Sequence, residues 1–134
     1  MPIIRMAQDI HLLQFLICER FQALRRDGYL VEGLRSNLHV PSFPYQFKNL
    51  FAVTCWRKDD RFHKEVIEYE AEGQEPIRSP HMDIEPVRDP ILFRWHTHRF
   101  PTSLTVQKPG ILWVRVILDW KVQFQSYLLI EKSS

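Results

Sequence analysis

The chain has 134 residues, a length typical of one domain, and 45% of them are hydrophobic, which is enough to build a core without disulfides or a structural metal. Its 18 basic and 16 acidic residues leave a formal net charge of +2, which is too balanced to indicate a protein that binds nucleic acids or anionic membranes. Two cysteines exclude a disulfide scaffold and a four-cysteine zinc site, and four glycines argue against a glycine-rich phosphate-binding loop.

We expect no secretory signal peptide in the first residues, because the apolar run 10–17 is interrupted by His11 and Gln14 and no small-residue cleavage site follows. No run approaches the roughly 20 apolar residues that span a bilayer. We therefore expect a cytoplasmic protein in which Cys18 and Cys55 stay reduced, as small buried hydrophobic residues. A disulfide between them is the alternative if the compartment is oxidising.

Residues 10–26 read IHLLQFLICERFQALRR, and their apolar positions fit either a helix or a buried strand. The Ala-Leu-Arg-Arg end, followed by Asp27 and Gly28, favours a helix. The β-branched and aromatic residues around Phe15, Ile17 and Phe21 favour a strand. Local propensity leaves both alternatives open.

Short apolar segments separated by turn residues follow this segment. They predict strands over residues 29–40, 50–56, 62–70, 91–100, 111–118 and 122–131. Four prolines between positions 72 and 90 predict a long acidic loop there, with at most a short edge strand at 82–87. Together these elements predict one all-β domain over residues 1–134, an antiparallel β-sandwich of about seven or eight strands. An immunoglobulin-like or related Greek-key topology is expected, with a partly open β-barrel as the alternative.

Four short motifs give the chain a resemblance to a known family. They are Leu16-Ile17-Cys18-Glu19, Gly33, Pro41-Ser42-Phe43-Pro44, and a closing segment in which Pro109-Gly110 is followed by alternating Leu, Val, Val and Leu and then by Asp119. With these motifs the chain resembles, over residues 10–131, a family of small bacterial all-β proteins of about 130 residues whose function is unknown.

Two positions depart from the pattern of that family. It usually has an aromatic residue where this chain has Leu112, and a glycine where this chain has Trp120. Both positions are structural. The resemblance implies that the segment 10–26 is a strand, and it implies no catalytic residues.

The His-Thr-His motif at positions 96–98 is the sharpest candidate for chemistry. On a strand, residues two apart point to the same face, so His96 and His98 could bind one metal ion. A metal site needs at least one further ligand, for which His81, Asp83 and Glu85 in the proline-rich segment are candidates.

Several features weaken this metal hypothesis. The cupin pattern also contains His-x-His, but a glutamate follows it, whereas this chain has no acidic residue between Asp89 and Asp119. Arg94 and Arg99 flank the pair, and nearby cations disfavour a divalent ion. The alternative is two histidines on a solvated strand face.

Other enzyme and cofactor signatures are missing from the sequence. There is no Gly-x-Ser-x-Gly motif, both cysteines fall inside predicted strands, and no glycine-rich loop suits a nucleotide. We therefore expect no catalytic residues and no cofactor.

Charge is unevenly distributed along the second half of the chain. Residues 68–89 carry seven acidic and two basic side chains, whereas residues 90–118 carry four basic and no acidic ones. The simplest interpretation is two surfaces that attract each other. The alternative is a basic patch in which Trp95, Phe100 and Trp113 stack on bases, but half of these aromatic residues must face the core. A nucleic-acid partner is not expected.

The last two strands predict an apolar outer surface. If Leu112, Val114, Val116 and Leu118 face inward, the outward side chains of this hairpin include Trp113, Arg115, Ile117 and Tyr127. Trp, Tyr and Arg are enriched at binding hot spots. The alternative is that this face is covered by the proline-rich loop or by the N-terminal segment.

The sequence thus supports two functional hypotheses. The first is a non-enzymatic cytoplasmic protein-interaction module that binds an unidentified protein, or a second copy of itself, through Trp113, Arg115, Ile117 and Tyr127. The second is a metal-binding protein or metal-dependent enzyme centred on His96 and His98. Neither involves a membrane.

Overall fold

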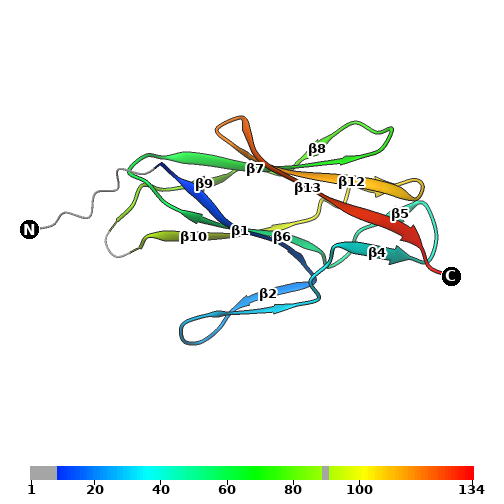
Figure 1. Cartoon of the computed structure of the whole chain (residues 1–134), viewed down its shortest axis with the longest axis horizontal. Helices are drawn as coiled ribbons and strands as arrows, with labels where there is room; N and C mark the ends of the chain where they lie inside the picture. The colour runs from blue at the N-terminus through cyan, green and yellow to red at the C-terminus, as the bar shows by residue number, and fades with distance from the viewer. Residues whose placement is uncertain (1–8, 89–90) are drawn as a thin grey trace, which may run out of the picture.

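A computed structural model describes residues 9–88 and 91–134, and these residues form β-strands and no helix (Figure 1). Accordingly, no helix long and apolar enough to cross a membrane occurs in the described ranges. The strands are β1 (His11–Cys18), β2 (Arg20–Ala23), β3 (Tyr29–Glu32), β4 (Asn37–Val40), β5 (Tyr45–Gln46), β6 (Phe51–Arg57), β7 (His63–Ala71), β8 (Ile77–Arg78), β9 (Met82–Ile84), β10 (Phe93–Arg99), β11 (Thr105–Val106), β12 (Gly110–Leu118) and β13 (Lys121–Lys132).

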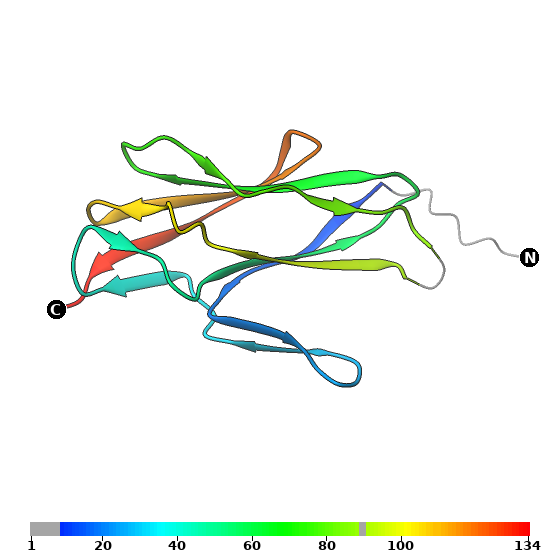
Figure 2. The same cartoon turned by 180° about the vertical axis from the view of Figure 1, so that it is seen from behind.

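Two sheets make up most of the molecule. The smaller sheet has the order β1-β6-β10 and is antiparallel. The larger sheet has the order β4-β13-β12-β7-β8, and β9 pairs with the start of β7. Figures 1 and 2 show the larger sheet curling over the smaller one, which confirms the all-β sandwich or partly open barrel predicted from the sequence. One pair departs from the antiparallel pattern, since β4 runs parallel to the end of β13.

The first segment is extended, so the helix alternative for residues 10–26 is wrong. β1 pairs with β6 from His11 opposite Arg57 to Cys18 opposite Phe51, and this pairing outweighs the local helix propensity. The chain then turns into the β2–β3 hairpin, whose tip contains Gly28 at φ 123°.

One hydrophobic cluster fills the space between the two sheets. β1 and β6 contribute residues from the smaller sheet, and β7, β12 and β13 contribute residues from the larger one. Its largest fully buried apolar side chains are Trp56, Tyr69, Ile67, Ile84, Leu104, Leu112, Leu128 and Ile130.

The outer face of the smaller sheet is covered by the β2–β3 hairpin. The rings of Phe21 and Tyr29 stack 5.0 Å apart, and both lie within 5.3 Å of the ring of Trp95 on β10. Trp95 pairs with Cys55 on β6, and Cys55 is buried. The hairpin therefore shields a face that would otherwise be open to water.

The proline-rich segment contains more regular structure than expected. β9 falls inside the predicted edge strand 82–87, but β8 is an additional strand that pairs with Glu68 and Tyr69 of β7. Residues 89 and 90, at the end of the predicted loop, lie outside the described ranges.

Two glycines occupy left-handed backbone conformations with different surroundings. Gly33 has φ 66°, and a Cβ placed on it would lie 2.7 Å from the carboxylate of Glu19. Gly73 has φ 73°, but a Cβ there would meet no atom within 4 Å. Both positions disfavour a side chain through backbone strain, and only Gly33 adds steric crowding.

We expect Gly73→Ala to lower the free energy of unfolding by about 1 kcal/mol through backbone strain alone. Gly33→Ala should lower it by about 2–3 kcal/mol, because Glu19 must also move away from its ion pair with Arg35. Urea denaturation of the two variants measures the difference, and equal losses would show that the crowding at Gly33 is unimportant.

Candidate functional site

The inner face of the smaller sheet carries polar side chains at its centre. On β10, His96 and His98 point inward, and their cross-strand neighbours on β6 are Thr54 and Ala52. The small side chains opposite the two histidines leave room for imidazole rings between the sheets. His98 is 2% exposed, and the ring centroids of the two histidines lie 5.9 Å apart.

Glu65 reaches the same point from the larger sheet. It lies on β7 and is completely buried. Its Oε1 atom lies 2.7 Å from His96 Nδ1 and 2.7 Å from His98 Nε2. One potential metal-binding atom from each of the three residues lies within 4.8 Å of the others. We refer to Glu65, His96 and His98 as the Glu-His-His cluster.

Two further side chains of β6 hold the Glu65 carboxylate in place. Thr54 Oγ1 donates to Oε1 at 3.0 Å, and Trp56 Nε1 donates to Oε2 at 2.6 Å. Burial alone would raise the pKa of Glu65, but hydrogen bonds and charge interactions with His96 and His98 outweigh it and lower the pKa to about 2. Glu65 is therefore an ionised carboxylate in the protein interior.

The protonation pattern of the cluster follows from this charge. An ionised carboxylate only accepts hydrogen bonds, so His96 Nδ1 and His98 Nε2 must carry the protons that they donate to Glu65. The second ring nitrogen of His98, Nδ1, is buried and has no hydrogen-bond partner within the described part of the chain. The cluster is thus an incompletely satisfied polar network inside an apolar core.

The structure corrects two expectations about the His-Thr-His motif. The alternative of a solvated face is wrong for His98, which is buried, and the side chain of His96 is only 10% exposed. The candidates for a third ligand were also wrong. His81 and Asp83 form an exposed pair on the proline-rich segment, and Glu85 is exposed.

Glu65 was not among the predicted ligands, because it lies 31 residues before His96 in the sequence. The signal was present in β7, since Ile67 and Tyr69 are core residues and strand alternation places Glu65 on their face. The flanking arginines lie on opposite faces of β10. Strand alternation places Arg94 on the face of His96 and His98, whereas the Arg99 guanidinium lies over the Phe51 ring on the outer face, 5.1 Å from its centroid.

A second buried histidine connects two turns of the molecule. His63 Nδ1 lies 2.6 Å from Asp119 Oδ2, and His63 Nε2 lies 2.8 Å from Asp59 Oδ1. Asp59 also accepts hydrogen bonds from the backbone N–H groups of Ile10 and Arg61. This Asp59–His63–Asp119 cluster joins the β6–β7 turn to the β12–β13 turn and to the start of β1.

The charges in this second cluster favour one another. Burial disfavours a charged His63, but hydrogen bonds and charge interactions with Asp119 and Asp59 outweigh it and raise the pKa of His63. Burial alone would raise the pKa values of Asp59 and Asp119. Their hydrogen bonds, including those with His63, outweigh burial and lower both pKa values. Both ring nitrogens of His63 face carboxylates, which suits an imidazolium that donates to both.

The two cysteines are buried and free. Cys18 pairs with Phe51 and Cys55 pairs with Gln14, so the register of β1 and β6 keeps the two thiols apart. Burial raises the pKa of Cys18 and raises that of Cys55 to about 11. Neither thiol has the low pKa of a nucleophile.

The predicted outer surface of the last hairpin is present only in part. Trp113 is half-buried, Tyr127 is 55% exposed, and their rings meet edge to face with centroids 5.6 Å apart. Ile117, however, is 2% exposed, so its assignment to the outer contact surface is wrong. β12 pairs regularly with β7 at this point, where Ile117 lies opposite Val66, and Val66 is also buried. This end of the outer face is therefore covered, although strand alternation assigns Ile117 to it.

Arg115 is already engaged within the chain. Its Nη1 donates to Glu68 Oε2 at 3.0 Å and to Glu70 Oε1 at 2.6 Å, and its Nε donates to Gln125 Oε1 at 2.6 Å. These ion pairs join the basic segment 90–118 to the acidic segment 68–89 within one molecule, a point that the charge pattern of the sequence left open.

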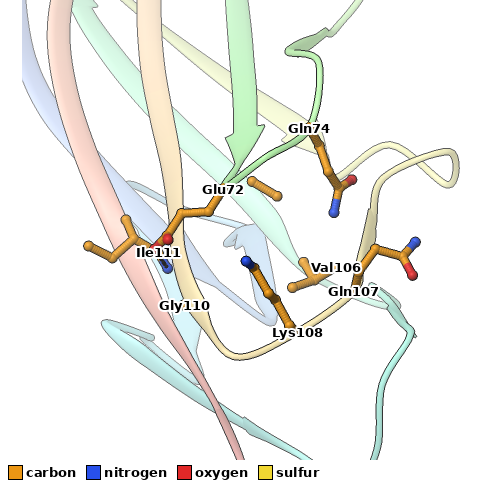
Figure 3. A pocket seen from close by; sticks show the side chains of 8 residues that line it. Glu72, Gln74, Val106, Gln107, Lys108, Gly110 and Ile111 are labelled. Atoms are coloured by element: carbon orange, nitrogen blue, oxygen red, sulfur yellow. Dashed lines mark hydrogen bonds between the residues drawn. The ribbon is translucent and has the colours of Figure 1, made fainter.

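A small pocket at the β11–β12 turn has little to offer a ligand. Figure 3 shows Glu72 and Lys108 beside it, and Glu72 accepts a hydrogen bond from the backbone N–H of Ile111 at 2.8 Å. A Cβ on Gly110 would lie 2.9 Å from the Glu72 carboxylate, so the glycine permits this close approach. Glu72 and Lys108 are exposed, so the pocket lacks the buried polar groups that orient a ligand.

Comparison of the chain with protein-family models and with curated proteins found no match. The resemblance to the small bacterial family therefore stays a prediction, and the functional argument rests on the geometry of the site.

We expect His63 to stabilise the fold in a pH-dependent manner. Its pKa is raised in the folded state, so its contribution is fully present below its ordinary pKa of about 6.5 and is lost as the pH rises through the raised value. The lowered pKa values of Asp59 and Asp119 act in the opposite direction, and their contribution is lost in acid. Denaturation at a series of pH values should show that His63→Gln costs more stability near pH 6 than at alkaline pH.

The matched control is His39→Gln, which removes an exposed histidine. It should change stability little at any pH. A cost of His63→Gln that does not vary with pH would contradict the charged state inferred for His63.

Proposed function

We propose that this chain is a metal-binding protein in which Glu65, His96 and His98 bind one divalent transition-metal ion. The observation that supports the proposal best is the convergence of the two histidines of one strand with a buried, ionised glutamate from the facing sheet. A buried carboxylate is costly unless it is paired or coordinates a metal.

The donor set suits this class of ion. Two imidazole nitrogens and one carboxylate oxygen are ligands for zinc, iron, cobalt or nickel, whereas calcium and magnesium prefer oxygen ligands. Trp56 Nε1 holds the second carboxylate oxygen of Glu65, as outer hydrogen bonds commonly orient metal-binding carboxylates.

The two spacings between Glu65 and the histidines require only a small adjustment. Neighbouring ligands about 2.1 Å from an octahedral metal lie about 3.0 Å apart. Glu65 Oε1 is 2.7 Å from each histidine nitrogen, so each pair would open by about 0.3 Å. The ion would replace the two protons that now bridge these atoms.

The burial of the site favours a structural ion over a catalytic one. A catalytic metal keeps a position open to water or substrate, whereas Glu65 and His98 are both fully enclosed between the sheets. An ion bound here would link β7 of the larger sheet to β10 of the smaller one. We therefore propose that its role is to join the two sheets.

We expect the purified wild-type protein to retain close to one equivalent of a divalent transition metal and to lose thermal stability when a chelator removes it. His96→Gln and His98→Gln should bind no metal, because each removes one ligand and leaves an amide of similar reach. Elemental analysis gives the metal content. Titration with Co²⁺ provides a visible absorption band from the bound ion.

Matched controls are His39→Gln and His81→Gln, which remove exposed histidines and should leave the metal content unchanged. If His98→Gln does not fold, the less buried His96→Gln decides the question. The proposal is wrong if the wild type carries no metal and neither Zn²⁺ nor Co²⁺ changes its thermal unfolding.

A second candidate function is the non-enzymatic protein-interaction module. The supporting observation is the Trp113–Tyr127 pair, which places two aromatic side chains on the outer face of the larger sheet. With Ile117 buried and Arg115 bound to Glu68 and Glu70, this aromatic pair is the part of the predicted surface that a partner could contact. Two free, buried thiols agree with a reducing compartment, and we propose the cytoplasm.

For this candidate we expect Trp113→Ala to abolish capture of a partner protein by the tagged chain and to leave the fold intact. Trp120→Ala is the control, because Trp120 lies in the β12–β13 turn and is 67% exposed. Partner capture by both variants alike would contradict the proposed surface.

A further inference from the structure

One side of the sandwich has open strand edges in both sheets. In the larger sheet, β4 pairs only with residues 129–132 of β13, and no described strand pairs with this edge from Lys121 to Leu128. In the smaller sheet, β1 is an edge strand whose described partner is β6. The Phe15 and Phe124 rings lie 5.2 Å apart, so these two open edges share one side of the molecule, the near side in Figure 1.

The open edge of β13 has backbone groups ready for pairing. The N–H of Leu129 donates to Ser36 O on the β4 side. Because alternate residues of a strand present their N–H and C=O groups to the same neighbour, Gln125 and Tyr127 present theirs to the open edge. The bulge of β13 at Gln123 ends this regular stretch, which leaves residues 124–128 as its pairing segment.

Both edges lack the charges that usually protect an exposed strand. Neither His11–Cys18 nor the segment 122–130 contains Asp, Glu, Lys or Arg, although 25% of the whole chain is charged. At that average, about four charged residues would be expected in these 17 positions, and native edges normally carry them to prevent pairing.

The side also exposes apolar side chains. Leu13 is 40% exposed, Val122 is 56% exposed and Phe124 is 40% exposed. Between them lies a shallow groove of about 230 Å³, lined by residues 10–12 of the β1 end and by Gln123 and Phe124. An uncharged edge with apolar neighbours fits a partner that is itself an uncharged strand with the same alternation.

We propose that a second copy of this chain occupies this side, through antiparallel pairing of β13 with the same strand of the other copy. The segment 124–128 is complementary to itself. A two-fold axis at Ser126 sets Gln125 opposite Tyr127, so that two residue pairs exchange their free backbone hydrogen bonds. No like charges face each other in this arrangement, and the open edges of β1 approach on the same side.

The size of the contact predicts a weak dimer. This side of the molecule is about 25 Å long. It is about 20 Å thick, because it spans two sheets stacked about 10 Å apart. Contact over the whole side would bury about 500 Å² of surface on each copy. The total of about 1,000 Å² lies at the lower limit of specific interfaces. Dimerisation should therefore depend on protein concentration, with dissociation in the micromolar range or weaker.

Sedimentation velocity of the untagged wild-type chain, from about 1 μM to about 1 mM, tests the proposal. The mass should rise with concentration from 16.1 kDa toward twice that value. Gln125→Pro should raise the dimer dissociation constant at least tenfold, because it removes an N–H that points to the open edge and takes no part in the pairing with β12. Gln125→Lys should act in the same direction by adding a charge to the edge.

Gln107→Lys makes the same substitution at an exposed position in the β11–β12 turn, and it should leave the dimer unchanged. Circular dichroism and thermal unfolding show whether each variant folds, and Gln125→Lys decides the question if the proline variant does not. The proposal is overturned if the wild type stays at 16.1 kDa over the whole range, or if a dimer forms equally well in both Gln125 variants.

Discussion

The carboxylate of Glu65 is the constraint on which the interior depends. It is an ionised group at 0% exposure between two sheets, and four donors approach it from Thr54, Trp56, His96 and His98. Removing any donor would leave part of a buried charge uncompensated, which costs several kcal/mol in other proteins. Because all four donors lie on the smaller sheet, this one side chain sets the distance and the alignment between the layers.

The alignment matters because apolar packing alone specifies position loosely. The aliphatic side chains around the cluster could slide past one another at small cost, whereas the hydrogen bonds to Glu65 are satisfied only at one register. The Asp59–His63–Asp119 cluster applies the same kind of restraint at the end of the sandwich where β6, β7 and the β12–β13 turn meet. Each cluster has one member on β7, and these members, His63 and Glu65, lie on the inner face of that strand. β7 therefore takes part in both polar restraints on the packing.

Strand positions were largely predictable from the sequence, and their partners were not. Predicted segments such as 50–56 and 111–118 match β6 and β12 closely, because each is a short β-branched or aromatic run bounded by turn residues. Whether residues 10–26 begin as a helix or as a strand depended on the pairing of β1 with β6, which local propensity does not encode. Likewise, alternation places His96 and His98 on one face of β10 and Glu65 on the core face of β7, but it does not reveal that these two strands face each other across the sandwich. Alternation also assigned Ile117 to the outer face of β12, but it does not reveal that this end of the face is covered.

The parallel contact between β4 and β13 has a consequence for how the chain reaches its fold. Asn37 pairs with Leu129, a separation of 92 residues, and β13 lies between β4 and β12 in the larger sheet. During synthesis, β4 emerges early and has no partner for its ladder until the last strand described here has been made. The β12–β13 hairpin must therefore form before the larger sheet can be completed. Contacts this distant in sequence slow folding, because the loop must close before the pairing stabilises it.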